Sequence, residues 1–352
     1  MLGWAVVALL AAGTAQEDLS SAVDEIVRKR LEPDGPGAAV LVVRDGKVVH
    51  RKGYGLANLE HRVPVAPETV FDLASVSKQF TATAVMILAD RGLLGFEDDA
   101  RKVLPELPEY DPERPIRVRD LLHHTSGLKD YLNLLPSVKG DPDRMKNEDV
   151  LKLLAGEKLA FRTGSKWSYS NSNYCLLALT VERLTKKTFA AVLQEGIFGP
   201  LGMKNAHVLD DVRKVIPHRA YGYGRSGKDW AYRHSDLVMT GDGAVLLSID
   251  DYALWDAALR EGKLVKPETL KRAFAPGALD DGKEHSYGFG WGLGAIGGRA
   301  IREHSGGWVG FSTYALRTAD DRLTVAVFSN QNSAFNPQGV ARAVAKLFLD
   351  AK

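Results

Sequence analysis

The sequence predicts an α+β fold in which strands from both ends of the chain form one antiparallel sheet, flanked by helices, with a mainly helical region inserted between them. Three observations support this: a strand hairpin near the N-terminus, a middle section with helical periodicity, and further strands near the C-terminus. Strand patterns at both ends favour one shared sheet, because the two ends must pair to bury their apolar faces.

A helix and a β-hairpin are predicted at the start of the chain. Apolar side chains recur at helical spacing in residues 17–31, and a turn rich in Pro and Gly follows. Two apolar segments, residues 38–43 and 47–50, then flank Asp45 and Gly46. Asp-Gly between two such segments is a strong hairpin signal, so we expect two antiparallel strands.

The middle of the chain is predicted to be helical. Residues 78–91 are rich in Ala, Val, Met, Ile and Leu and end at Gly92, which is typical of a buried helix. Proline-rich connections separate it from further predicted helices at residues 118–123, 148–154, 173–184 and 189–197. We expect a helical region of about residues 79–285 inserted in a single domain of residues 16–352.

Strand patterns return near the C-terminus and supply the rest of the sheet. The expected elements are strands at residues 286–293, 313–316 and 323–329 and a closing amphipathic helix at residues 340–349. A turn at Asp320 and Asp321 joins the last two strands. Active sites favour the seam between such a sheet and an inserted region.

The composition of the chain indicates to which classes of protein it can belong. The 352 residues are 45% hydrophobic and 26% charged with a formal net charge of +2, which is typical of a globular protein and unlike a basic nucleic-acid binder. We therefore expect no nucleic-acid partner. The single cysteine, Cys175, excludes an internal disulfide and is expected to pack as a small apolar side chain.

The N-terminus has the pattern of a signal peptide. An apolar stretch at residues 2–12 leads to small residues that end at Ala15, before a charged segment. This stretch is shorter than the roughly 20 residues of a membrane span. We expect a signal peptide of residues 1–15, a secreted or periplasmic protein, and no stable membrane span after processing. A buried N-terminal helix is the alternative.

The first candidate motif for catalysis is Ser75-Val76-Ser77-Lys78, at the point where the predicted strand region ends and the predicted long apolar helix begins. Residues i and i+3 are neighbours on a helix, so the Ser75 hydroxyl and the Lys78 amine can share one face. A hydroxyl at a helix N-terminus also lies near backbone N–H groups that favour developing negative charge. Ser-x-x-Lys alone is weak, because a helix cap followed by a surface lysine gives the same pattern.

Two later motifs carry compatible chemistry. Tyr169-Ser170-Asn171 can present a phenolic proton carrier and an orienting amide from one tight loop, although a surface turn is the alternative. In the segment His304-Ser305-Gly306-Gly307, glycines permit a substrate to lie along a backbone edge, and a hairpin turn is the alternative.

In this order and spacing, the motifs resemble the serine β-lactamase-like superfamily of class C β-lactamases, D,D-peptidases, D-aminopeptidases and related esterases. The resemblance covers most of the mature chain. Further stretches that read like this family are residues 36–40, 54–58, 71–75, 121–128 and 243–248. It implies a β-lactamase/transpeptidase-like fold and a serine hydrolase that needs no metal or other cofactor.

The resemblance also implies a role for each motif residue. Ser75 would be the nucleophile, Lys78 its proton partner, and Tyr169 the general base or proton relay, while Lys78 could itself be the base. Asn171 would orient lysine and substrate. The backbone N–H groups of Ser75 and Gly307 would form the oxyanion hole, and His304, Ser305 and Gly306 would be substrate-binding residues beside it.

Two departures bear on the substrate. His304 stands where class C enzymes have a lysine, and a neutral histidine binds a substrate carboxylate less strongly. Tyr131 stands where they have an amide-binding glutamine, and an aromatic ring suits an apolar group better. We therefore expect weak hydrolysis of cephalosporins.

The expected partner is a small-molecule or peptide substrate, for example one derived from the cell wall. Three substrate classes remain open: a D-amino-acid peptide, a β-lactam and a small ester. A binding or sensor protein that is acylated by penicillin without efficient turnover is the alternative function.

The adjacent His123 and His124 do not share a helix face, and no metal-ligand spacing occurs, so we expect no metal. Aromatic and glycine stretches at residues 221–224 and 287–292 could line a pocket or pack within strands.

Overall fold

The computed structural model describes residues 17–138, 141–332 and 334–351. The predicted signal peptide, residues 1–15, lies outside these ranges. None of the helices within them combines the length and apolar character needed to cross a membrane.

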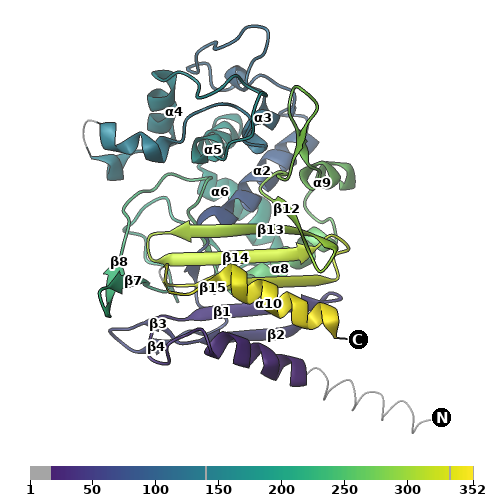
Figure 1. Ribbon diagram of the computed structural model, residues 1–352. Coiled ribbons are helices and arrows are strands. Elements are labelled where there is room, and N and C mark those ends of the chain that lie inside the picture. Colours follow the sequence, from purple (N-terminus) through teal and green to yellow (C-terminus); the bar gives the residue numbers. More distant parts are fainter. Residues whose placement is uncertain (1–16, 139–140, 333, 352) are drawn as a thin grey trace, which may run out of the picture.

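One six-stranded antiparallel sheet contains strands from both ends of the chain, as predicted (Figure 1). Its strands, in spatial order, are β12 (Gly292–Ile296), β13 (Arg299–Trp308), β14 (Phe311–Thr318), β15 (Leu323–Ser329), β1 (Ala38–Arg44) and β2 (Lys47–Tyr54). The first and last thirds of the chain meet where β1 pairs with β15, Ala38 lying opposite Ser329. The predicted α+β fold class is confirmed.

The β1–β2 hairpin follows from local turn chemistry. Asp45 and Gly46 both have positive φ, 49° and 79°, which the two-residue turn requires and which Asp and Gly tolerate. Because β1 is central in the sheet, its side chains are buried on both faces.

Helices cover the two faces of the sheet. On one face, a helix that includes residues 17–28 and α10 (Pro337–Asp350) pack against Ala38, Val40, Val42 and the other apolar side chains of that face. On the other face, α2 (Lys78–Asp90) and α8 (Ile249–Arg260) pack against the opposite set. This second core continues into the helical region drawn above the sheet in Figure 1.

The middle of the chain is mainly helical, as expected, and also contains short strands. Its other helices are α3 (Val118–Leu122), α4 (Asn147–Ala155), α5 (Asn171–Thr185), α6 (Phe189–Leu193), α7 (Gly199–Leu201) and α9 (Pro267–Ala273). Its short strands, with those after β2, are β3 (Leu56–Asn58), β4 (Val63–Pro64), β5 (Phe71–Asp72), β6 (His207–Val208), β7 (Gly222–Ser226), β8 (Asp229–Arg233), β9 (Val245–Leu247), β10 (Gly277–Ala278) and β11 (Glu284–His285).

The strand predicted at residues 286–293 is wrong in its bounds. Residues 286–291 form no regular strand, and β12 begins only at Gly292. The cause is close packing against the start of α2: Gly290 has φ of 75°, and a Cβ there would lie 2.6 Å from the carbonyl oxygen of Lys78. The long strand β13, which follows, was not predicted.

Candidate active site

Ser75 lies in a strained turn between strand β5 and helix α2. It belongs to a 3₁₀ turn, Ala74–Ser77, that continues directly into α2, so it precedes the α-helix rather than lying in its first turn. Ala74 has φ of 48°, a left-handed conformation that costs energy for a residue with a side chain. The carboxylate of Asp72 accepts a hydrogen bond from the Ala74 N–H at 2.8 Å and holds this turn.

Lys78 is fully buried and connects three parts of the chain. Its Nζ atom lies 3.0 Å from Ser75 Oγ, 2.9 Å from Asn171 Oδ1 and 2.6 Å from the carbonyl oxygen of Asp242. An ammonium group can donate to all three oxygens. A neutral amine can instead donate to Asn171 and Asp242 and accept a proton from Ser75, so the contacts suit either protonation state.

Tyr169 joins this group through its ring. Lys78 Nζ lies 4.9 Å from the ring centroid, within cation–π range. The phenolic oxygen is buried and makes no hydrogen bond within the described part of the chain. The structure therefore brings the Tyr169 ring to the amine, but no hydrogen bond joins the phenolic oxygen to Ser75 or Lys78.

Asn171 is fixed by an aspartate that sequence reasoning missed. It is the first residue of α5, and Asp130 accepts hydrogen bonds from both its backbone N–H and its side-chain amide, each at 2.9 Å. This pairing orients the amide so that its oxygen faces Lys78. The amide oxygen of Asn171 thus contacts Lys78 and its amide nitrogen contacts Asp130, while its orienting role toward the substrate stays a prediction.

The segment His304–Gly307 lies on β13, beside the turn that carries Ser75. It pairs with β14 on one side, from His304 opposite Ala315 to Gly307 opposite Ser312. On the other side, β12 pairs only with residues 299–303, so the rest of β13 presents an edge unpaired by any described strand. Such an edge can hydrogen-bond to an extended substrate.

Gly306 explains how closely β13 approaches Ser75. A Cβ on Gly306 would overlap the carbonyl oxygen of Leu73 and the hydroxyl of Thr313, whereas a Cβ on Gly307 would meet nothing within 4 Å. Thr313 also donates a hydrogen bond to the Leu73 carbonyl at 2.8 Å. The strand is therefore held against the Ser75 turn by a contact that only glycine permits.

His304 is a buried, neutral histidine. Burial, together with the nearby Lys78 charge, lowers its pKa from 6.5 to about 3. Its Nδ1–H donates to the Ser305 carbonyl at 2.7 Å, so Nε2 accepts from the Tyr287 hydroxyl at 2.8 Å. Ser305, by contrast, is exposed. His304 thus supplies shape and a hydrogen-bonded aromatic contact at the site, without a positive charge.

A buried aspartate, Asp242, forms the floor beneath Lys78. Its carboxylate accepts hydrogen bonds from Tyr131 Oη at 3.1 Å and Cys175 Sγ at 3.2 Å. Burial raises its pKa, and the Lys78 charge opposes that rise. Tyr131 is only 2% exposed, and it borders the site with its hydroxyl bound to Asp242.

His124 supports Tyr169 from behind. Its Nδ1 accepts hydrogen bonds from the Ser170 N–H at 3.2 Å and the Asn173 amide at 3.1 Å. Its ring lies 4.4 Å from that of Tyr169, centroid to centroid. The residue is fully buried with φ of 60°, and burial lowers its pKa well below 6.5.

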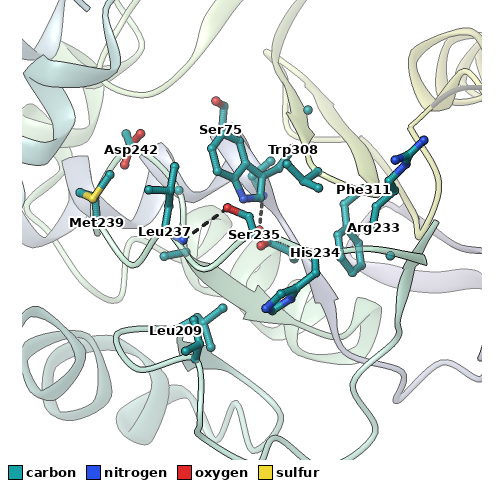
Figure 2. Close-up of a pocket in the computed structure, with 18 of the residues that line it drawn as sticks. Ser75, Leu209, Arg233, His234, Ser235, Leu237, Met239, Asp242, Trp308 and Phe311 are labelled. Atoms are coloured by element: carbon teal, nitrogen blue, oxygen red, sulfur yellow. Dashed lines mark hydrogen bonds between the residues drawn. The ribbon is translucent and has the colours of Figure 1, made fainter. Parts of the chain in front are cut away.

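A cavity of about 300 Å³ opens beside Ser75 (Figure 2). Ser75, Tyr131, Asn171 and Gly307 border it. Figure 2 shows Trp308 next to Ser75, with Leu209, Leu237 and Met239 around the same space. Of the aromatic and glycine stretches, Tyr221 and Gly222 also line this cavity, whereas Tyr287 hydrogen-bonds to His304.

Within the described ranges, no group of three or more His, Cys, Asp and Glu side chains is arranged to hold a metal ion. His123 instead donates from Nδ1 to the Tyr287 carbonyl at 2.9 Å. Asp130 and Asp242 are site residues that sequence reasoning missed, whereas Tyr287 belongs to an aromatic stretch that was expected to line a pocket or to pack within strands. His124 stood inside a family-like stretch, so that stretch was the one signal that could have identified it.

Comparison with known proteins identifies relatives. The model of the family described as Beta-lactamase matches residues 23–348. A penicillin-binding protein of Bacillus subtilis (strain 168) is 32% identical over 311 residues, which cover 83% of this chain and 67% of that protein. A D-aminopeptidase of Gluconobacter oxydans (strain 621H) is 33% identical over 305 residues, which cover 85% of this chain and 57% of that protein.

The chain therefore spans about two thirds of the first relative and just over half of the second. Among solved structures, the octameric penicillin-binding protein homologue from Pyrococcus abyssi superposes with a TM-score of 0.80 at 25% sequence identity, covering 95% of this chain and 77% of that one. The resemblance inferred from the motifs thus holds over nearly the whole described chain.

Proposed function

The chain belongs to the Beta-lactamase family, and from this premise we propose that it is a serine hydrolase that forms an acyl-enzyme at Ser75. The observation that carries the proposal is the 3.0 Å contact between Lys78 Nζ and Ser75 Oγ in a buried site that borders a cavity. Relatives named as a D-aminopeptidase and a penicillin-binding protein support acyl-transfer chemistry on this fold.

In the proposed acylation step, Ser75 Oγ attacks the substrate carbonyl carbon while its proton passes to a base, which is either the neutral amine of Lys78 or the phenolate of Tyr169. The carbonyl oxygen becomes an oxyanion, held by the backbone N–H groups of Ser75 and Gly307. Collapse of this intermediate breaks the bond to the leaving group, which takes the proton. Water then attacks the acyl-enzyme, and the same groups return the proton to Ser75.

The substrate class is proposed to be an ester, an amide or a D-amino-acid peptide rather than a cephalosporin. A neutral His304 adds no positive charge for a carboxylate on the leaving side. Tyr131 presents an aromatic wall where a glutamine would bind an amide, and its hydroxyl is already bound to Asp242. Action outside the cytoplasm is likewise a proposal, drawn from the N-terminal pattern alone.

The experiment that tests the function compares a chromogenic short-chain ester with a fluorescent penicillin and follows Ser75 by mass spectrometry. An enzyme releases product rapidly with little adduct. A stable Ser75 adduct without product would instead identify an acylated sensor. The Ser75→Ala variant must lose both signals, and product release by this variant would refute the assignment of the nucleophile.

A further inference from the structure

The cavity beside Ser75 lies on one side of the proposed nucleophile. Its lining includes Ser75, Asn171 and Gly307 but, among the described residues, neither Tyr169 nor His304. The leaving group must receive a proton, and the proposed proton carriers lie outside the cavity. The leaving half of a substrate therefore extends toward Tyr169, and the cavity receives the acyl half.

About half of the cavity wall is apolar. Its apolar side chains include Leu132, Leu209, Leu237, Met239, Trp308 and Phe311. A wall of this kind accommodates a hydrocarbon chain or ring, and a few polar groups then fix its orientation.

The charged side chains of the cavity wall differ in whether they already form a hydrogen bond or an ion pair with another part of the protein. They are Asp72, Arg219, Arg233, His234 and Asp242. Asp72 and Asp242 are buried and accept hydrogen bonds from the protein. Arg233 donates to a backbone carbonyl oxygen, and its guanidinium points away from Ser75 in Figure 2. His234 pairs with Asp236.

Arg219 is the remaining charge. Its side chain is half-buried on the cavity wall and forms no hydrogen bond or ion pair within the described residues, although its charge opposes the rise in the pKa of the nearby buried Asp72 carboxylate. Tyr221 and Tyr232, whose rings lie 5.5 Å apart, share this wall and also make no side-chain hydrogen bond there. The site thus offers a guanidinium and two phenols as donors with no acceptor from the described protein.

We propose that the acyl half of the substrate carries a carboxylate that is bound by Arg219, an inference that rests on the proposed acyl transfer at Ser75. A guanidinium donates two parallel hydrogen bonds to a carboxylate and is its preferred partner at partly buried sites. The same charge repels a protonated amine, so acyl groups that end in a free amine are disfavoured.

The test uses matched 4-nitrophenyl esters of six-carbon acids: hexanoate, hydrogen adipate and 6-aminohexanoate. We expect the adipate ester to have the highest kcat/KM. Arg219→Gln should lower kcat/KM for this ester by about ten- to a hundredfold, as expected for loss of a charged hydrogen bond, and leave the hexanoate ester within about twofold. Arg219→Glu should shift the preference to the amino ester.

Arg233→Gln is the matched control, because this arginine borders the same cavity but points away from Ser75. It should keep the adipate preference. If the wild-type protein hydrolyses hexanoate without preferring adipate, or if Arg219→Gln slows all esters equally, the inference is overturned while the proposed function stands.

Failure of every ester would count against the proposed function, and binding would then decide the inference. The Ser75→Ala protein is titrated calorimetrically with adipamate and hexanamide, which differ by one carboxylate. Tighter binding of adipamate that disappears when Arg219→Gln is added supports the inference. Equal affinities for the two amides overturn it.

Discussion

The thiol of Cys175 donates a hydrogen bond to Asp242 Oδ1, with Sγ and Oδ1 3.2 Å apart. Both residues are buried, and the backbone carbonyl of the same aspartate accepts a hydrogen bond from Lys78. The only cysteine is therefore more than an apolar filler, because its S–H satisfies one oxygen of a buried carboxylate that lies beneath the proposed proton carrier.

This contact predicts different outcomes for two substitutions, one that keeps a hydrogen-bond donor and one that removes it. Cys175→Ser keeps a donor and should leave activity nearly unchanged. Cys175→Val removes the donor and leaves a buried carboxylate oxygen unsatisfied, which should lower the free energy of unfolding by about 1–3 kcal/mol. Urea denaturation of the two variants checks this, and equal stability of both would show that the hydrogen bond is unimportant.

The glycines of β13 are predicted to have unequal tolerance. Gly306→Ala places a methyl group against the Leu73 carbonyl and the Thr313 hydroxyl, so β13 must move away from the Ser75 turn. We expect a loss of about 1–3 kcal/mol in the free energy of unfolding, together with a loss of ester hydrolysis. Gly307→Ala is the stability control, because its Cβ meets open space. Equal melting temperatures for the two variants would contradict the close contact.

These contacts show what the sequence could and could not predict. The Asp45-Gly46 hairpin was predictable because its turn chemistry is local. Strand β13 was missed because Gly306 and Gly307 have low strand propensity, and long-range packing against Leu73 determines their conformation. The proximity of Ser75 and Lys78 follows from helical spacing.

The remaining site geometry depends on tertiary contacts between distant segments. The Asp242 carbonyl that binds Lys78 is a backbone atom 164 positions along the chain, which no side-chain pattern indicates. Orientation of the Tyr169 phenol depends on His124 behind it and Tyr287 beside it. Helical spacing therefore predicted that Ser75 and Lys78 meet, and the family resemblance implied that Tyr169 and Asn171 join them, but neither indicated which atoms touch.

Tyr169→Phe tests which group is the base. The phenolic oxygen has no hydrogen-bond partner among the described residues, so its removal should not reduce stability. If Tyr169 carries the proton, kcat should fall by about a hundredfold or more. Tyr174→Phe is a control, since the Tyr174 hydroxyl donates to the Leu122 carbonyl rather than toward Ser75. An unchanged kcat in Tyr169→Phe would assign the role of base to Lys78.

Stability is predicted to fall on mild acidification. Burial lowers the pKa of His50 and His123 to about 4 and that of His304 to about 3. Between these values and 6.5 the unfolded chain binds more protons than the folded one, so this stability is present above pH 6.5 and is lost as the pH falls. Burial raises the pKa of Asp72 to about 6, and this group opposes the trend by losing stability as the pH rises.

A shift of one pKa unit corresponds to about 1.4 kcal/mol. The stability lost through the three histidines exceeds the stability gained through the one aspartate, so the free energy of unfolding should fall by about 4 kcal/mol from pH 7.5 to pH 5. Denaturant unfolding across this range measures it. The loss should be smaller in His123→Gln, which keeps a donor for the Tyr287 carbonyl but cannot be protonated. A stability that is flat between these pH values would show that these histidines are not buried as neutral groups.

His124 is predicted to position Tyr169. His124→Asn keeps an acceptor for the Ser170 N–H and tolerates the positive φ, but it loses the ring that lies 4.4 Å from Tyr169. We expect a nearly normal melting temperature and a kcat reduced by about ten- to a hundredfold, because the phenol is misplaced. His124→Phe keeps a ring but lacks the acceptor for the Ser170 N–H, so its main effect should be a lower melting temperature. A full kcat in a stable His124→Asn protein would remove His124 from this role, since this variant keeps the acceptor and lacks only the ring.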